Sequence, residues 1–151
     1  MKINTRQFGE VSIDDDKIIN MPDGIPGFKQ QERYVILEKK DTAPFYLFQC
    51  VDDPNLAFVI MDPLRFYPEY TLSVKDFDKT IKWEFGKEEL SCFVIITIPK
   101  GKPEDMTANF MAPIVINNER KEGMQLILQG SPYSHQQLLL KEEKDQIKHS
   151  Y

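Results

Sequence analysis

The sequence predicts a mainly β protein, a sandwich or barrel of about nine or ten short strands with one or two short helices. Three observations predict this class. Runs of β-branched and aromatic residues recur at strand length, as in residues 56–61 and 91–98. Turn-forming residues separate these runs, as in Asp-Asp-Pro-Asn at residues 52–55. Before the polar C-terminal tail, only residues 75–85 and 132–140 are compatible with a short helix.

The N-terminal part shows the alternation of apolar and polar side chains that is typical of half-buried strands. Residues 2–13 alternate in this way with Gly9 between two halves, which predicts a hairpin or a bent strand. The three aspartates at 14–16 predict a charged turn, and residues 17–21 predict another short strand.

The loop Met-Pro-Asp-Gly-Ile-Pro-Gly-Phe over residues 21–28 alternates prolines, which fix φ, with glycines, which tolerate positive φ. We predict a rigid loop in which Gly24 or Gly27 adopts positive φ. Such a loop serves either as a recognition platform or as a tight crossover that packs Ile25 and Phe28 into the core.

Further strands are predicted at residues 34–37, 45–51, 56–61, 70–74, 91–98 and 124–128. Residues 56–61 are continuously apolar, so this strand is buried on both faces or lies at a barrel interior. Residues 63–70 hold two prolines and three aromatics, so they are not regular throughout. The aromatics there are either exposed contact residues or a cap over an open end of the barrel.

Residues 75–85 predict a short helix. Asp76 suits a helix cap, and three apolar side chains follow at a spacing of four residues. Alternation within residues 80–85 is also compatible with a strand. The later segment 132–140 fits either a last helical turn or a short strand.

Residues 107–117, Thr-Ala-Asn-Phe-Met-Ala-Pro-Ile-Val-Ile-Asn, form the longest apolar run that polar residues bracket closely. The β-branched residues 114–116 favour a strand. Because Pro113 has no amide proton, this strand is predicted to be broken, bulged or at an edge near its middle. Asn109 and Asn117 suit the turns at its ends, since a short amide can bond its own backbone.

A chain of 151 residues is long enough for one domain with its own core, which we place at residues 1–140. Residues 141–151 form a polar, charged tail that predicts a solvated helix or a frayed end. No signal-peptide pattern is visible, and no apolar run reaches the ~18 residues of a membrane span. We expect a cytoplasmic protein without a membrane partner.

Cysteine and histidine usage gives no pattern of catalytic or metal chemistry. Cys50 and Cys92 lie in apolar runs without a Cys-x-x-Cys partner, which favours reduced, largely buried thiols over a disulfide. The two histidines, His135 and His149, belong to no zinc or nucleophile motif. We therefore expect no metal, no cofactor and no enzymatic activity. Adjacent carboxylates such as Glu88 and Glu89 would point to opposite faces of a strand, so they would not form an acid–base pair there. We predict that they are solvated charges in turns.

The net charge is −5, from 24 acidic and 19 basic side chains. An acidic surface repels a phosphate backbone, so direct binding to nucleic acid is not expected. A basic protein partner would suit this surface, because opposite fields speed encounter.

Two motifs carry a family resemblance. The run at residues 107–117 and the Pro-x-Gly-Ile-Pro-Gly-Phe loop at residues 22–28 are similar to signatures of the flagellar assembly factor FliW family. Matching segments follow in family order at Pro44-Phe45, residues 55–63, residues 125–128 and Pro132-Tyr133, while residues 75–90 depart from the family pattern. The resemblance covers residues 1–140 and implies a compact, mostly antiparallel β-barrel.

The resemblance also implies a function. FliW proteins bind flagellin before its export, and they bind CsrA, an RNA-binding translational repressor of flagellin synthesis. Flagellin that accumulates occupies FliW and leaves CsrA free to repress. Exported flagellin releases FliW, which binds CsrA away from its RNA-binding face and relieves repression allosterically. The alternative from the residues is a barrel that binds a small molecule, or an enzyme with a dispersed site.

We choose candidate partner-binding residues on physical grounds. They are acidic residues in predicted turns and aromatic residues in the irregular segment at residues 63–70. The acidic candidates are Asp52, Asp53, Glu69 and Asp76, and the aromatic candidates are Phe66, Tyr67 and Tyr70.

Overall fold

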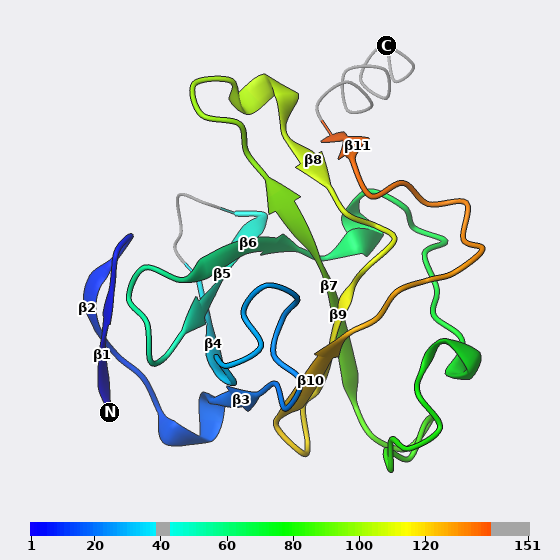
Figure 1. Ribbon diagram of the computed structural model, residues 1–151, viewed down its shortest axis with the longest axis horizontal. Coiled ribbons are helices and arrows are strands. Elements are labelled where there is room, and N and C mark those ends of the chain that lie inside the picture. Colours follow the sequence, from blue (N-terminus) through cyan, green and yellow to red (C-terminus); the bar gives the residue numbers. More distant parts are fainter. Residues whose placement is uncertain (39–42, 140–151) are drawn as a thin grey trace.

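In the part of the chain that the structure describes, the backbone consists almost entirely of strands and connecting turns (Figure 1). The structure is a computed structural model that describes residues 1–38 and 43–139. Its strands are β1 (Lys2–Thr5), β2 (Gly9–Ser12), β3 (Ile19–Asn20), β4 (Arg33–Leu37), β5 (Phe45–Cys50), β6 (Ala57–Met61), β7 (Leu90–Thr97), β8 (Thr107–Ala108), β9 (Ile114–Asn117), β10 (Glu122–Gln125) and β11 (Gln137–Leu138). Short 3-10 turns are η1 (Asp15–Lys17), η3 (Pro63–Arg65), η4 (Val74–Asp76) and η5 (Pro103–Asp105).

The large sheet closes into a ring, because β9 pairs with both β10 and β7. The order around the ring is β7, β6, β5, β4, β3, β10, β9, and all neighbours are antiparallel except β3 and β10. Strands β8 and β11 continue the sheet beyond β7, and β1 with β2 forms a separate hairpin. The prediction of a mainly β fold with a closed, mostly antiparallel sheet is confirmed.

The apolar run between β8 and β9 is interrupted near its middle, as its proline predicts. Both strands pair with β7, and residues 94–95 of β7 lie opposite residues 109–113. Two residues thus face five, and the extra residues form a bulge. The side-chain oxygen of Asn109 accepts hydrogen bonds from the amides of Met111 and Ala112, each at 3.1 Å. The asparagine therefore fixes the bulge through the local bonding that its position predicts.

The interior of the ring is filled by apolar side chains. Tyr34 and Phe48 stack with ring centroids 4.6 Å apart, and both are fully buried. Around them pack Ile19, Met21, Ile25, Cys50, Leu56, Ile60, Ile114 and Ile116. Alternate positions along each strand point inward, so that each strand has an inner and an outer face. This packed interior counts against the alternative of a barrel that holds a small molecule.

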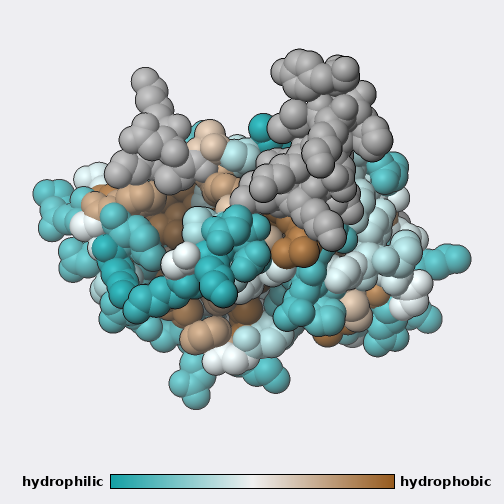
Figure 2. All heavy atoms as spheres, turned by 90° about the horizontal axis from the view of Figure 1, so that it is seen from above, coloured by the Kyte–Doolittle hydropathy of each residue, from teal (hydrophilic) through white to brown (hydrophobic). Residues whose placement is uncertain are grey.

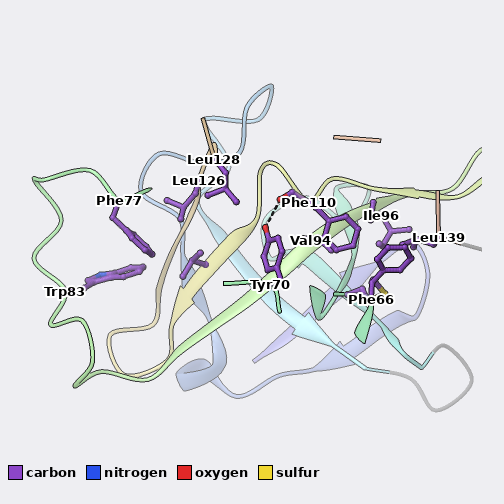
Figure 3. Close-up of a cluster of buried hydrophobic side chains, with 13 residues drawn as sticks. Phe66, Tyr70, Phe77, Trp83, Val94, Ile96, Phe110, Leu126, Leu128 and Leu139 are labelled. Atoms are coloured by element: carbon purple, nitrogen blue, oxygen red, sulfur yellow. Dashed lines mark hydrogen bonds between the residues drawn. The ribbon is translucent and has the colours of Figure 1, made fainter. Parts of the chain in front are cut away.

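A second core covers the outer face of β6, β7 and β9 (Figure 3). The irregular segment between β6 and β7 supplies its aromatic side chains Phe66, Tyr70, Phe77 and Trp83, and Phe110 lies in the bulge after β8. A third, smaller cluster lies under the β1–β2 hairpin and contains Ile3, Ile13, Val35 and Val51. The ring is thus packed on both faces, with loops in place of covering helices.

The predicted helix over residues 75–85 is wrong, and so is the predicted strand at residues 70–74. Only the single turn η4 forms there, followed by irregular turns. Asp76 accepts a hydrogen bond from the amide of Ser73 at 2.8 Å, and Asp78 accepts one from the amide of Thr80 at 2.9 Å. Short side chains that bond nearby amides stabilise turns at the expense of a helix. The predicted tail at residues 141–151 lies outside the described residues.

The proline- and glycine-rich loop has the backbone that its sequence predicts. Gly24 and Gly27 both have positive φ, at +62° and +89°. Ile25 is 3% exposed and packs into the barrel interior, whereas Phe28 is 44% exposed. The crossover interpretation is therefore confirmed for Ile25 and wrong for Phe28.

Candidate partner-binding surface

The acidic candidate residues divide into two separate regions. Asp52 and Asp53 lie in the turn between β5 and β6, which Figure 1 shows beside the β1–β2 hairpin. Glu69 and Asp76 lie in the irregular segment between β6 and β7, which is on the opposite side of the molecule in the same view. The structure therefore does not bring the four carboxylates together.

The β5–β6 turn is held by a buried glutamine. The side-chain amide of Gln49 donates to the carbonyls of Asp53 and Leu56, both at 3.1 Å. Arg33 forms an ion pair with Asp52, with Nε 3.0 Å from Oδ2. Its hydrogen bond is the main cause that lowers the pKa of the Asp52 carboxyl below its ordinary value. The turn is thus rigid, and a cation already neutralises one of its two carboxylates.

The aromatic candidates are structural. Phe66 and Tyr70 are 7% and 5% exposed, so the prediction that these aromatics are exposed contact residues is wrong for both. Tyr67 is half-buried, with its ring centroid 4.8 Å from that of Phe110. The Tyr70 hydroxyl donates to the Phe110 carbonyl at 2.6 Å (Figure 3), and burial raises the pKa of this tyrosine. These side chains hold the irregular segment against the outer face of the ring, and not over an open end of the barrel as the capping interpretation predicts.

A groove of about 540 Å³ lies between this segment and β7. Apolar side chains dominate its lining, and among them Leu64 is 50% exposed. The other apolar lining residues are Pro63, Tyr70, Leu72, Phe77, Phe85, Leu90, Cys92, Phe93 and Val115. Glu69 and Asp76 are sequence neighbours of the lining residues Tyr70 and Phe77. The groove therefore combines apolar contact area with nearby negative charge, which suits a basic protein partner.

Other exposed apolar side chains are dispersed. Figure 2 shows one face, on which small apolar patches lie among hydrophilic residues. The exposed large apolar residues are Met1, Phe28, Leu64, Ile98, Ile127 and Leu138. Single apolar residues at a surface are common, so the groove lined by Leu64 is the strongest candidate for a contact site among the described residues.

The cysteines are both free thiols, in line with the prediction of reduced cysteines. Cys50 is fully buried, and Cys92 is mostly buried in the lining of the groove, in line with the prediction of largely buried thiols. Burial raises the pKa of Cys92 to about 12, which keeps it a thiol rather than a reactive thiolate at neutral pH.

Glu88 has a structural role that its sequence position does not reveal. Its carboxylate accepts from Nε of Arg120 at 2.8 Å, from Nδ2 of Asn117 at 2.9 Å and from the amide of Glu84 at 2.8 Å. These bonds tie the turn before β7 to the turn between β9 and β10. The Arg120 hydrogen bond is the largest cause that lowers the pKa of Glu88 to about 2. The prediction of a solvated turn charge is therefore wrong for this residue.

The Glu88 cluster makes a pH-dependent contribution to stability. A carboxyl whose pKa is lowered on folding stabilises the native state fully above its unfolded value of 4.5, and the contribution is lost as the pH falls through about 2. Glu88→Gln should therefore lower the free energy of unfolding at pH 7, with a deficit relative to the wild type that shrinks between pH 4.5 and pH 2. Urea unfolding across this pH range measures the deficit, and Glu89→Gln, at an exposed neighbour, is the control. A deficit that does not change with pH would contradict the role of the charge.

The described residues contain neither a metal-ligand cluster nor a membrane-spanning helix. No group of three His, Cys, Asp or Glu side chains in residues 1–38 and 43–139 has the spacing to hold a metal ion. No helix in this part of the chain has the length and hydropathy needed to span a bilayer.

Comparisons with known proteins agree over almost the whole chain. The family model described as FliW protein matches residues 2–139. The flagellar assembly factor FliW of Caldanaerobacter subterraneus subsp. tengcongensis is 36% identical over 151 residues, which cover 99% of this chain and 100% of the relative. The same factor of Alkaliphilus metalliredigens is 38% identical over 94% of this chain and 88% of its own length.

The fold is also that of a solved structure. A crystal structure of the flagellar assembly factor FliW superposes with a TM-score of 0.81 and 33% sequence identity. The match covers 94% of this chain and 99% of that one. A family model that spans the described domain, full-length relatives and a closely similar solved fold all agree, and this chain belongs to the FliW family of flagellar assembly factors.

Proposed function

We propose that this protein is a cytoplasmic regulator that binds the translational repressor CsrA and, in alternation, flagellin. Bound to CsrA, it relieves repression of flagellin mRNA; bound to flagellin, it leaves CsrA free to repress. It acts on CsrA by protein contact away from the RNA-binding face and does not bind nucleic acid itself. The function is a binding equilibrium, without catalysis or a cofactor.

Membership of the FliW family over residues 2–139 is the observation that carries this proposal. The match includes the loop at residues 22–28, the bulged run at residues 107–117 and all of the core. The net charge of −5 supports it independently, because an acidic protein is attracted to a basic RNA-binding protein and repels the RNA that competes for it.

The groove beside the irregular segment is the surface that we assign to CsrA. It offers apolar contact area and the carboxylate of Asp62, and Glu69 and Asp76 adjoin two of its lining residues in the sequence. The β5–β6 turn is a weaker choice, since Arg33 already neutralises Asp52. Electrostatics should act mainly on the association rate, because exposed pairs contribute only about 0–1 kcal/mol each at equilibrium.

Association kinetics with purified CsrA test this assignment. The double variant Glu69→Gln/Asp76→Asn should slow association at low salt, removing much of a steering enhancement that is on the order of 10-fold. Ionic strength near 0.1 M should diminish the difference, since the Debye length is then ~10 Å. The amide at position 76 keeps an oxygen that can accept the Ser73 amide hydrogen bond, so the local turn should persist.

Two matched variants complete the design. Asp52→Asn/Asp53→Asn removes the same number of charges at the other candidate region, and Glu104→Gln/Asp105→Asn does so in η5. Both should slow association less than the groove variant. Equal slowing by all three variants would show that net charge alone causes the effect, and it would contradict the assignment of the groove to CsrA. Absence of any CsrA binding would overturn the functional proposal.

A further inference from the structure

The strands of the ring share the fewest residue pairs at β3. This strand has two residues, and it joins β10 through the single parallel pair of Asn20 and Glu122. On its other side β3 pairs with β4 only at Tyr34 and Arg33. Strand β4 continues to Leu37 and remains paired there with β5. The last three residues of β4 therefore have a strand on one edge and, among the described residues, none on the other.

The direction of the β4 backbone groups follows from two hydrogen bonds. The carbonyl of Arg33 accepts from the amide of Val51 at 2.9 Å, which directs this residue to the β5 side. The carbonyl of Glu32 accepts from the amide of Met21 at 2.6 Å, which directs that residue to the β3 side. Antiparallel strands alternate in this respect, so Ile36 directs its amide and carbonyl to the β3 side, beyond the end of β3. An unpaired edge of this kind is a template for an added strand.

A cavity of about 400 Å³ lies directly at this edge. Its apolar lining comes from the barrel side chains Ile19, Ile36 and Ile116 and from Ile13, Val35 and Leu37. Its polar lining consists of Ser12, Asp14, Lys17, Asn118 and Lys121. The space therefore provides apolar pockets on either side of a strand edge, which is the arrangement used in β-strand addition.

The charge at this cavity is opposite to that of the whole chain. Two lysines, Lys17 and Lys121, face one carboxylate, Asp14, in a protein of net charge −5. Lys121 has φ of +55°, a conformation that few residues other than glycine adopt, and its carbonyl accepts from the amide of Asn20 at 2.9 Å. The β9–β10 turn is thus fixed to β3 with one lysine at the cavity.

We infer that the free edge of β4 is a binding site for an extended peptide segment of a partner protein, one that carries a carboxylate. The segment would take the place beside β4 that β3 leaves open, pair with the amide and carbonyl of Ile36, and direct its carboxylate to Lys17 and Lys121. This site is separate from the groove assigned to CsrA and does not rest on that assignment. Its charge selects an acidic segment, whereas the groove selects a basic surface.

A synthetic peptide tests the site. The probe is six residues of alternating threonine and valine, acetylated at the N-terminus and ending in a free carboxylate. Titration into the labelled full-length protein, followed by NMR, should shift the amide of Ile36 and slow its hydrogen exchange. The C-terminally amidated peptide should bind about tenfold more weakly, since a charge-assisted hydrogen bond is lost. Lys17→Glu should weaken the carboxylate peptide likewise, whereas Lys79→Glu, exposed and outside the cavity, should not.

N-methylated peptides separate strand addition from simple charge attraction. Methylation at alternate residues blocks one edge of the peptide at a time, so one of two such peptides should lose binding and the other should keep it. Equal binding of both, or an unshifted Ile36 amide at peptide concentrations that saturate any response, would overturn the inference. Binding that ignores both amidation and Lys17→Glu would overturn the assigned carboxylate chemistry.

Discussion

Replacing Gly24 by alanine is expected to lower the free energy of unfolding by about 2–5 kcal/mol, or to prevent folding. The alanine would adopt φ of +62°, which costs about 1–2 kcal/mol for a residue with a Cβ. That Cβ would also lie 2.6 Å from Cα of Lys29 and 2.8 Å from the carbonyl oxygen of Phe28. Both are backbone atoms, so the loop itself would have to move, and overpacking of this kind costs about 1–3 kcal/mol more.

Gly27 provides the matched comparison. It also has positive φ, at +89°, but a Cβ built on it meets no atom within 4 Å. Gly27→Ala should therefore cost only the backbone term, about 1–2 kcal/mol. Chemical denaturation of both variants measures the difference. Equal losses of stability in the two variants would contradict the close approach of the Phe28 and Lys29 backbone to Gly24.

Phe110→Ala is expected to lower the free energy of unfolding by about 3–5 kcal/mol, the range for truncating a buried phenylalanine. Phe110 is fully buried, and its ring contacts Phe66 at 5.3 Å and Tyr70 at 5.8 Å between centroids. These contacts hold the irregular segment against the outer core. The substitution leaves in place the backbone carbonyl that accepts the hydrogen bond of the Tyr70 hydroxyl. The loss of stability therefore measures the contribution of the aromatic ring.

The control for this prediction is Phe28→Ala, which truncates the same side chain at a position 44% exposed. It should cost well under the Phe110 value, because less apolar area leaves contact with the protein. Hydrogen exchange adds a local readout, in which Phe110→Ala should expose amides of the segment that borders the groove. A Phe110→Ala variant as stable as Phe28→Ala would contradict the central role of this ring.

Local patterns in the sequence were sufficient for most of the barrel. Aromatic and β-branched runs of strand length predict β4, β5, β6 and β7 within a residue or two, because such side chains pack well on a buried, pleated surface. Pro113 predicts the interruption between β8 and β9, and the glycines of the 21–28 loop predict positive φ. Each of these predictions depends on a residue whose own backbone restrictions decide the structure.

The features that the sequence did not predict depend on contacts between distant residues. Glu88 bonds Arg120, 32 positions away, so nothing near Glu88 distinguishes it from its neighbour Glu89. The aromatics at 66 and 70 are buried by Phe110, which a local pattern does not reveal. The helical spacing at residues 75–85 gave a wrong prediction, because Phe77 contacts Trp83 and Phe85 in a folded-back loop and local carboxylates bond its turns.

The candidate site was predictable only in its chemistry. The acidic balance is visible in the composition, but the separation of Asp52 and Asp53 from Glu69 and Asp76 is a property of the sheet order. The groove likewise exists because the segment before β7 crosses the outer face of the ring, which no motif in that segment indicates.

Release of CsrA from RNA is the most direct measure of the proposed partner switch. A labelled flagellin mRNA leader is bound to CsrA, this protein is added in increasing amounts, and the bound fraction is followed by fluorescence anisotropy; purified flagellin is then added. We expect this protein to release the RNA and flagellin to restore the CsrA–RNA complex. RNA that stays bound to CsrA at a large excess of this protein, or release that flagellin does not reverse, would contradict the proposed partner switch.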